Sequence, residues 1–395
     1  MRLLYLGNWA LNDGLTQATV IPHIRLLLRS EKLQHLVFVT IERNGQVPQT
    51  PSYLVNDKIS YEPLVSRNMN LNIFNRILDL KDFRSQIKLL IKKYNIEKVI
   101  ARGSPAGGLI YSICAKNNIP LYVESFEPHA DYMKESGVWG QFDPRFLLEK
   151  KWESALKKKA TGLIPVAERY KQQLIKEGVK GEKIAVVPCS VNLEKFNYKE
   201  DDRIRIRKML NIPEDAFVGV YVGKFGGYYF NDEAFLLYKK IMDVSDTWIL
   251  IVSPDPPEQI LQKIKEFDLQ AERIKITSAN HDEVSSYLSA ADFGFATIKP
   301  SQSKNFLSLI KIGEYWACGL PVIITENVGD DSDFIEEQGI GVKLKNGWKD
   351  QSSSFYLNMV AELKEIKDKP RIRSIAEQRR SLNNVVKAYE YFDLL

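Results

Sequence analysis

Short apolar runs alternate along this chain with longer segments in which apolar residues recur every three or four positions. Such runs predict buried strands, and the periodic segments predict amphipathic helices. In the first half of the chain, the apolar runs occupy residues 2–7, 36–41, 98–101, 120–124 and 162–166. The helical segments there are residues 15–29, 83–93 and 106–116. Because helices separate successive strands, this pattern predicts a parallel sheet.

The same alternation returns in the second half. Its apolar runs occupy residues 216–222, 248–252, 274–277 and 293–296, and a further run follows Pro321. Two rounds of one pattern in 395 residues predict an α/β protein with two Rossmann-like domains. We interpret the charged stretch 199–207 as the linker into the second domain. The predicted domains are therefore residues 1–198 and 199–370, and residues 371–395 form a final charged helix.

The charge is distributed unevenly between the two halves of the chain. Residues 1–200 hold 30 basic and 20 acidic side chains, and residues 201–395 hold 25 and 30. A first half with a charge of +10 favours an acidic partner there, such as anionic lipid or a phosphate-bearing acceptor. An ordinary solvated surface explains the excess nearly as well. The overall composition, 44% apolar and 27% charged, is that of a globular protein.

Composition also disfavours several classes of protein. The cysteines Cys114, Cys189 and Cys318 lie far apart in sequence, which favours structural thiols in a reducing compartment over a metal site. Asn8 and Asp13 interrupt the first apolar run, so we interpret it as a strand rather than an export signal. The sequence has no run of about 18 apolar residues that could span a membrane. It also lacks a G-x-G-x-x-G motif, so a dinucleotide cofactor is disfavoured.

The segment 308–325 carries the strongest candidate chemistry. It predicts a helix that ends at Gly319, followed by a buried strand. Lys311 and Glu314 are three positions apart and therefore share one face of this helix, amid apolar neighbours. A carboxylate can accept hydrogen bonds from both hydroxyls of a ribose, and a lysine near a helix N-terminus suits a diphosphate. An exposed ion pair on a packed helix is the alternative.

A second candidate loop follows the predicted strand 216–222. It reads Gly223-Lys224-Phe225-Gly226-Gly227, just before a predicted helix. Glycines and a lysine in this place can surround phosphate oxygens with backbone N–H groups and one cation. The loop is not a Walker motif, because no G-K-[ST] opens the helix.

In the first half, polar clusters follow two of the predicted strands. Arg102, Gly103 and Ser104 follow one strand, and Glu127 and His129 lie shortly after another. Ligands of parallel α/β sheets bind beyond the carboxyl ends of the strands, so these clusters are site candidates. For Arg102 a surface ion pair is the alternative, and for His129 a structural or solvent-exposed position.

Residues 144–159 predict a basic amphipathic helix. Its apolar positions and its lysines could dock on an anionic bilayer. An ordinary helix with one face in the core and one in solvent is the favoured alternative.

Three segments resemble retaining glycosyltransferases of family 4, which have the GT-B type of structure. Residues 311–323 resemble the family segment K-x-x-E-Y-x-A-C-G-x-P-V-I. Residues 184–196 are similar in apolar spacing to I-x-V-I-P-N-G-V-D-x-x-x-F, which ends the first domain in that family. The glycine-rich loop at 223–229 corresponds to G-R-x-x-x-x-K-G, with Lys224 on the arginine.

The resemblance implies a GT-B fold, in which two Rossmann-like domains face an interdomain cleft and the last helix crosses back to the first domain. It further implies transfer of a sugar from a nucleotide diphosphate sugar to a hydroxyl of a glycan or lipid-linked acceptor, with retention of configuration. We therefore expect no metal, no cofactor and no nucleic-acid partner. The setting would be surface polysaccharide or glycolipid assembly in the cytoplasm or at the inner face of the membrane.

The resemblance also assigns roles to residues. Glu314 would hold the donor ribose, Lys224 and Lys311 would stabilise the departing diphosphate, and His129 would contact the sugar. The other donor-binding candidates are Gly14, Gly223, Gly226, Gly227, Ser278, Ala279 and Ser308. On the acceptor side the candidates are Arg102 and Glu127.

Two departures from the family pattern keep other functions open. Phe306 stands where family members often carry a second glutamate, and Tyr229 stands where the glycine-rich loop carries its lysine. The alternatives are a GT-B nucleotide-sugar epimerase and a catalytically weak subunit that only binds a donor or a glycan.

Overall fold

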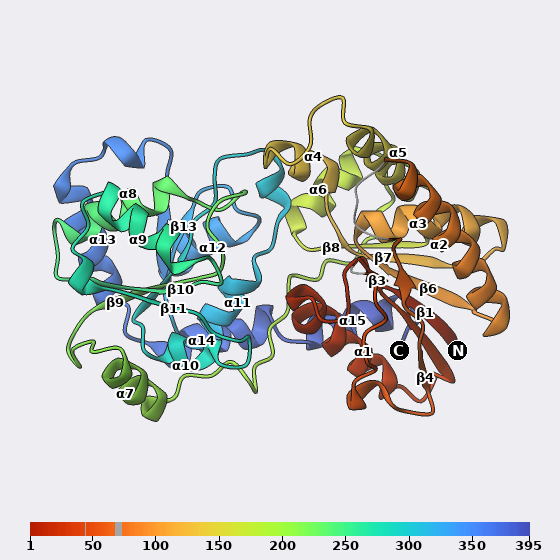
Figure 1. Ribbon diagram of the computed structural model, residues 1–395, viewed down its shortest axis with the longest axis horizontal. Coiled ribbons are helices and arrows are strands. Elements are labelled where there is room, and N and C mark those ends of the chain that lie inside the picture. The colour runs from red at the N-terminus through yellow and green to blue at the C-terminus, as the bar shows by residue number, and fades with distance from the viewer. Residues whose placement is uncertain (44, 68–72) are drawn as a thin grey trace. The chain divides into compact units, whose positions relative to one another are not determined.

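The computed structural model describes residues 1–43, 45–67 and 73–395, and it divides the chain into two compact units. Unit 1 consists of Met1–Pro188 together with Leu382–Leu395, and unit 2 consists of Cys189–Ser381 (Figure 1). Each unit contains one six-stranded parallel sheet with helices on both of its faces (Figure 1). The fold is therefore the expected α/β fold with two Rossmann-like halves.

In unit 1 the strands follow the order β4-β2-β1-β6-β7-β8. These strands are β1 (Arg2–Leu6), β2 (His35–Val39), β4 (Ile59–Tyr61), β6 (Lys98–Arg102), β7 (Leu121–Phe126) and β8 (Gly162–Pro165). A separate pair is formed by β3 (Ile41–Glu42) and β5 (Leu64–Val65). The central strands are apolar on both sides because helices cover both faces.

The helices of unit 1 include one from the far end of the chain. They are α1 (Ile21–Leu28), α2 (Ile73–Lys93), α3 (Gly103–Lys116), α4 (His129–Glu135), α5 (Pro144–Lys159), α6 (Glu168–Lys176) and α15 (Asn383–Tyr391). Helices α3 and α5 pack closely, and a Cβ atom on Gly108 would lie 2.2 Å from the ring of Trp152. Only glycine permits this contact.

A buried carboxylate ties α15 to the sheet of unit 1. Glu124 on β7 accepts hydrogen bonds from the hydroxyls of Tyr5 and Tyr389 and from Nη1 of Arg102, the last at 3.2 Å. Nδ1 of His23 lies 3.2 Å from Oε2 of Glu124. Burial opposes ionisation of this carboxyl, but His23, Arg102 and Tyr389 together lower the pKa of Glu124 to about 2. The final helix is thus anchored by charge as well as by apolar contacts.

Unit 2 repeats the architecture with the strand order β11-β10-β9-β12-β13-β14. The strands are β9 (Val218–Val222), β10 (Trp248–Val252), β11 (Ile274–Thr277), β12 (Phe293–Ala296), β13 (Val322–Thr325) and β14 (Gly341–Leu344). The helices are α7 (Glu200–Met209), α8 (Asp232–Met242), α9 (Pro257–Glu266), α10 (Val284–Ser289), α11 (Ile310–Ala317), α12 (Asp331–Gln338), α13 (Ser353–Glu365) and α14 (Lys369–Arg379).

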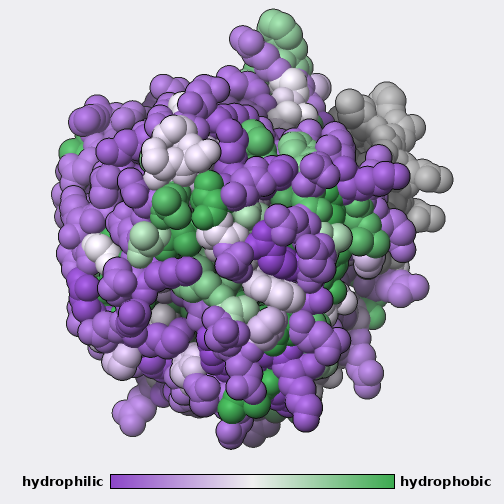
Figure 2. Space-filling view, turned by 90° about the vertical axis from the view of Figure 1, so that its left-hand side faces the viewer, coloured by the Kyte–Doolittle hydropathy of each residue, from purple (hydrophilic) through white to green (hydrophobic). Residues whose placement is uncertain are grey.

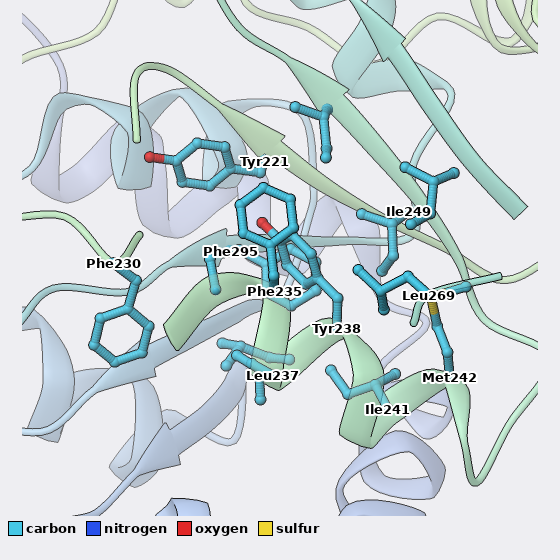
Figure 3. Packing of buried hydrophobic residues seen from close by; sticks show 14 of the residues in the cluster. Tyr221, Phe230, Phe235, Leu237, Tyr238, Ile241, Met242, Ile249, Leu269 and Phe295 are labelled. Atoms are coloured by element: carbon cyan, nitrogen blue, oxygen red, sulfur yellow. The ribbon is translucent and has the colours of Figure 1, made fainter. Parts of the chain in front are cut away.

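An aromatic cluster fills the core of unit 2 between the sheet and α8. Figure 3 shows Phe235 and Tyr238 of α8 beside Phe295 of β12. The ring centroids of Tyr238 and Phe295 lie 4.9 Å apart, in an edge-to-face arrangement. The molecular face in Figure 2 is mostly hydrophilic, with small scattered hydrophobic patches. The burial of the cluster residues shows that large apolar side chains of unit 2 fill its interior.

The structure corrects the expected role of the charged stretch 199–207. It is not a linker, because residues 200–209 form α7 within unit 2. Three acidic residues lie in the first turn of this helix, where their negative charge interacts favourably with the positive end of the helix dipole. Arg207 is 2% exposed and forms an ion pair with Asp292 at 2.9 Å, which fixes the helix on the unit.

The bounds of the compact units differ from the predicted domain limits. The division falls between residues 188 and 189, where 198 and 199 were expected. The predicted final helix is two helices, α14 in unit 2 and α15 in unit 1, and the division between the units falls between them, at residues 381 and 382. Asp368 caps α14 by accepting a hydrogen bond from the backbone N–H of Arg371.

Removing the hydroxyl of Tyr389 tests the anchor of α15. In Tyr389→Phe, one hydrogen bond to the buried carboxylate of Glu124 is lost, and we expect amide hydrogen exchange in residues 383–391 to become faster on the order of tenfold. Tyr391→Phe is the matched control, because this hydroxyl donates to the exposed carbonyl of Glu182 and not to a buried carboxylate. Equal exchange rates in the two variants, measured by mass spectrometry, would contradict the anchor.

Candidate functional site

The loop after β9 has a backbone that requires glycine at three positions. Gly223, Gly226 and Gly227 have φ angles of +126°, +82° and +61°, which side chains other than glycine rarely adopt. The backbone N–H of Gly223 donates to the carbonyl of Val252, and that of Phe225 donates to Oδ2 of Asp255 at 2.7 Å. The loop is therefore held in one shape at the carboxyl end of the sheet.

Lys311 extends from α11 to this loop and has an unusual environment. The residue is 7% exposed, and its Nζ atom lies 4.4 Å from the ring centroid of Tyr221 and 3.9 Å from that of Tyr229. Within the described part of the chain, Nζ has no hydrogen-bond partner. A Cβ atom on Gly223 would lie 3.4 Å from Nζ, so this glycine also leaves room for the ammonium group.

Burial has a large effect on the titration of this lysine. It lowers the pKa of Lys311 to about 7, and the negative charge of Glu314 opposes the shift. Water stabilises an ammonium group strongly, so a buried one without hydrogen bonds is costly. An anion that reached Nζ would supply the missing partner. This environment is typical of a binding site.

The position of α11 is fixed by its neighbour Tyr315. The hydroxyl of Tyr315 accepts a hydrogen bond from the backbone N–H of Val222 at 3.1 Å and donates to the carbonyl of Phe295 at 3.2 Å. A Cβ atom on Gly294 would lie 2.5 Å from the tyrosine ring, so glycine at that position permits the approach. One aromatic side chain thus holds the helix at the carboxyl ends of β9 and β12.

Glu314 is a second buried charged group on α11. It is 6% exposed, and its Oε1 atom lies 3.1 Å from Nε2 of His281. Nδ1 of His281 lies 2.6 Å from Nζ of Lys195. The sequence pattern does not predict His281 or Lys195 as site residues. The sequence nevertheless places both residues beside segments that resemble the family. His281 follows the loop 277–280, and Lys195 precedes Phe196 in the segment 184–196.

The remaining donor-side candidates of unit 2 occupy different surroundings. Lys224 and Ser278 are exposed, and Ala279 is half-buried. Ser308 accepts hydrogen bonds from the backbone N–H of Cys189, at 3.1 Å, and from Arg380. Its hydroxyl is therefore engaged in the structure of unit 2. The structure brings Lys311 beside Gly223 of the glycine-rich loop, whereas Glu314 on the same helix contacts His281.

The candidates of unit 1 lie in other elements. Arg102 is buried and pairs with Glu124, so the alternative of a surface ion pair is wrong. Burial raises the pKa of Glu127 to about 7, with Arg102 opposing the shift and Glu153 adding to it. Burial also lowers the pKa of His129 to about 4, and its ring lies 5.7 Å from that of Trp139. His129 is therefore neutral at pH 7.

Gly14 lies in an exposed position, and among the described residues no atom beyond its chain neighbours is within 4 Å of the place a Cβ would occupy. Its φ angle is not in the left-handed region, so this position tolerates other residues.

Within residues 1–43, 45–67 and 73–395, no group of histidine, cysteine, aspartate and glutamate side chains could hold a metal ion. In the same ranges, no helix is long and apolar enough to cross a membrane.

Comparisons with known proteins define the class of the fold. Residues 216–352 match the family described as Glycosyl transferases group 1. Among curated proteins, no sequence matches this chain. The structure of Anabaena HepE in complex with UDP and glucose is 13% identical, with a TM-score of 0.70 and coverage of 100% of both chains.

Two further structures have the same fold. WaaG, a glycosyltransferase involved in lipopolysaccharide biosynthesis, is 15% identical, with a TM-score of 0.66 and coverage of 96% of this chain and 94% of WaaG. A Listeria monocytogenes protein assigned as a UDP-N-acetylglucosamine 2-epimerase is 13% identical, with a TM-score of 0.63 and coverage of 100% and 98%. The chain has the GT-B fold. Within it, residues 216–352 match the group 1 glycosyl transferases, which confirms the resemblance for the greater part of unit 2.

Proposed function

We propose that this protein is a retaining glycosyltransferase that moves a sugar from a nucleotide diphosphate sugar to a hydroxyl of a glycan or lipid-linked acceptor. The observation that carries the proposal is the buried ammonium group of Lys311, which has no hydrogen-bond partner in the described residues and lies beside the glycine-rich loop. A diphosphate is an anion of suitable size and charge for such a loop. HepE, which has the same fold, binds UDP and glucose.

Tyr229 replaces a lysine of the family pattern, and the ammonium group of Lys311 lies beside it. Family members carry a lysine at that loop position, and here Nζ of Lys311 lies 3.9 Å from the centre of the Tyr229 ring. A cation from α11 therefore approaches the position at which the loop itself lacks one. This arrangement supports a role for Lys311 beside the leaving diphosphate, together with the exposed Lys224.

In the proposed reaction, the bond between the sugar and the diphosphate breaks while the acceptor hydroxyl attacks the anomeric carbon from the same face, and the proton of that hydroxyl passes to an oxygen of the departing diphosphate. The diphosphate leaves with the bonding electron pair, and negative charge grows on its oxygens. Fixed cations stabilise that charge without reorganisation, so the mechanism needs no metal. Glu314 accepts hydrogen bonds from the ribose hydroxyls, and Ser278, Ala279, Ser308 and Gly14 remain donor-side candidates.

We further propose that unit 1 supplies the acceptor side. His129 contacts the transferred sugar as a neutral imidazole, in keeping with its lowered pKa. Arg102 and Glu127 stand near the carboxyl ends of β6 and β7, where parallel sheets bind ligands. Assembly of a surface polysaccharide or glycolipid on the cytoplasmic side of a membrane is the proposed setting, and WaaG serves in lipopolysaccharide biosynthesis.

An epimerase is the second candidate function, because the Listeria protein shares the fold. A panel of UDP-, ADP- and GDP-sugars, with and without glycan and glycolipid acceptors, separates the alternatives. Release of nucleoside diphosphate that depends on an acceptor is the expected result. Release without acceptor, together with an epimerised sugar, would favour the epimerase. Donor binding without any turnover would favour a binding subunit.

Variants of the two charged residues test their separate roles. We expect Glu314→Ala to weaken nucleoside diphosphate binding about 10- to 100-fold, because hydrogen bonds to a carboxylate are lost.

Lys224→Ala should lower kcat on the order of 100-fold with little change in binding, since its charge matters most as the diphosphate leaves. Lys208→Ala is the control, an exposed lysine on α7. Wild-type affinity in Glu314→Ala, or wild-type kcat in Lys224→Ala, refutes the corresponding role.

The membrane contact that we propose does not use the apolar face of α5. Phe146 and Leu156 of that helix are buried, so the helix packs as an ordinary core-facing helix. The connection before it stands out from unit 1 (Figure 1) and exposes Val138 by 52% and Phe142 by 86%, and Leu147 in the first turns of α5 is 56% exposed. Exposed apolar side chains next to lysines suit an anionic bilayer.

Vesicle binding tests this contact. We expect the wild-type protein to sediment with vesicles of phosphatidylcholine and phosphatidylglycerol, and Phe142→Asp to lose binding at least about fivefold, because it replaces apolar contact with a like charge. Val55→Asp is the matched control, because Val55 is another exposed apolar residue of unit 1, 73% exposed. Equal sedimentation of the two variants contradicts the proposed contact.

A further inference from the structure

We infer that His281 is a positioning residue: it holds the carboxylate of Glu314 in the orientation that accepts ribose hydroxyls, and Lys195 fixes the tautomer of its ring. The inference rests on the proposed function, because it concerns the residue proposed to bind ribose. It goes beyond that function by assigning a role to His281 and Lys195. All three side chains belong to unit 2.

The distances determine which ring nitrogen carries the proton. An ammonium group can only donate hydrogen bonds, and Nζ of Lys195 lies 2.6 Å from Nδ1 of His281. Nδ1 must therefore offer its lone pair. The proton of the neutral ring is then on Nε2, which donates to Oε1 of Glu314 at 3.1 Å. The lysine thus selects the tautomer that binds the carboxylate.

A short turn of unit 2 presents this lysine to the histidine. Oδ1 of Asn192 accepts hydrogen bonds from the backbone N–H groups of Glu194 and Lys195, both at 3.1 Å. Phe196, 1% exposed, packs against the ring of His281 with centroids 5.4 Å apart. The same turn therefore contacts the imidazole through an aromatic ring, at an interplanar angle of 59°, and through a lysine at Nδ1. Lys195 also pairs with the exposed Asp282 at 2.6 Å.

The hydrogen bond from His281 holds the Glu314 carboxylate in one orientation and occupies one of its two oxygens. Oε1 accepts the hydrogen bond from His281, and within the described residues Oε2 accepts none. A carboxylate oxygen can accept more than one hydrogen bond, so both oxygens retain capacity for ribose hydroxyls. Holding the group in advance reduces the conformational entropy lost on binding. Without the histidine, the side chain could turn toward the ammonium group of Lys311.

Binding of paired nucleotides measures this role. The probes are the tightest-binding member of a UDP, ADP and GDP panel and its 2′,3′-dideoxy counterpart, which lacks the hydroxyls that Glu314 would bind. The ratio of their Kd values in the wild type is the discrimination for ribose. We expect His281→Phe, which keeps an aromatic ring against Phe196 but cannot donate, to reduce this discrimination at least about fivefold. Affinity for the dideoxy nucleotide should change less than about twofold.

A conservative variant separates positioning from folding. His281→Gln retains an N–H donor and should recover much of the discrimination, and Lys195→Met, which removes the charge but keeps an unbranched side chain, should lose part of it. Unchanged discrimination in His281→Phe would overturn the inference alone. An equal loss of affinity for both nucleotides would also overturn it, because that is the effect of a purely structural residue. Failure of every nucleotide to bind the wild type would overturn the proposed function and this inference together.

Discussion

The site of unit 2 depends on one constraint, a buried ammonium group kept without a hydrogen-bond partner among the described residues. Removing a charge from water is costly unless something compensates. The rings of Tyr221 and Tyr229 supply cation–π attraction to Lys311, and Glu314 supplies opposite charge. Gly223 leaves the space that the group occupies. None of these replaces a hydrogen bond, so an anion that reached Nζ would supply the partner that the group lacks.

The two units share one architecture but differ in whether a buried charge has hydrogen-bond partners. Both have six-stranded parallel sheets, and both bury charge near the carboxyl ends of the strands. In unit 1, Glu124 is satisfied by two tyrosines, an arginine and a histidine, and that charge anchors α15. In unit 2, Lys311 contacts two aromatic rings, and none of the residues that the structure describes accepts a hydrogen bond from it. The first arrangement stabilises a fold, whereas the second is suited to binding.

The alternation of strands and helices could be predicted from the sequence, because apolar runs and the three- to four-residue spacing of apolar positions are local properties. It also placed Lys311 and Glu314 on one helix face, which follows from their spacing alone. It did not predict His281 or Lys195, since their contacts join segments separated by 86 positions. The linker interpretation of 199–207 failed because the charge of Arg207 is buried against Asp292, a pairing that local sequence cannot reveal.

Proton uptake on binding tests the central claim most directly. The pKa of Lys311, lowered to about 7 by burial, should rise when a diphosphate lies beside Nζ, so affinity should fall as the pH rises above 7. Calorimetric titration at pH 8, in buffers of different ionisation enthalpy, measures the protons taken up per nucleoside diphosphate. We predict uptake approaching about one proton in the wild type and none in Lys311→Met. Nucleotide binding by the wild type without proton uptake would contradict the account.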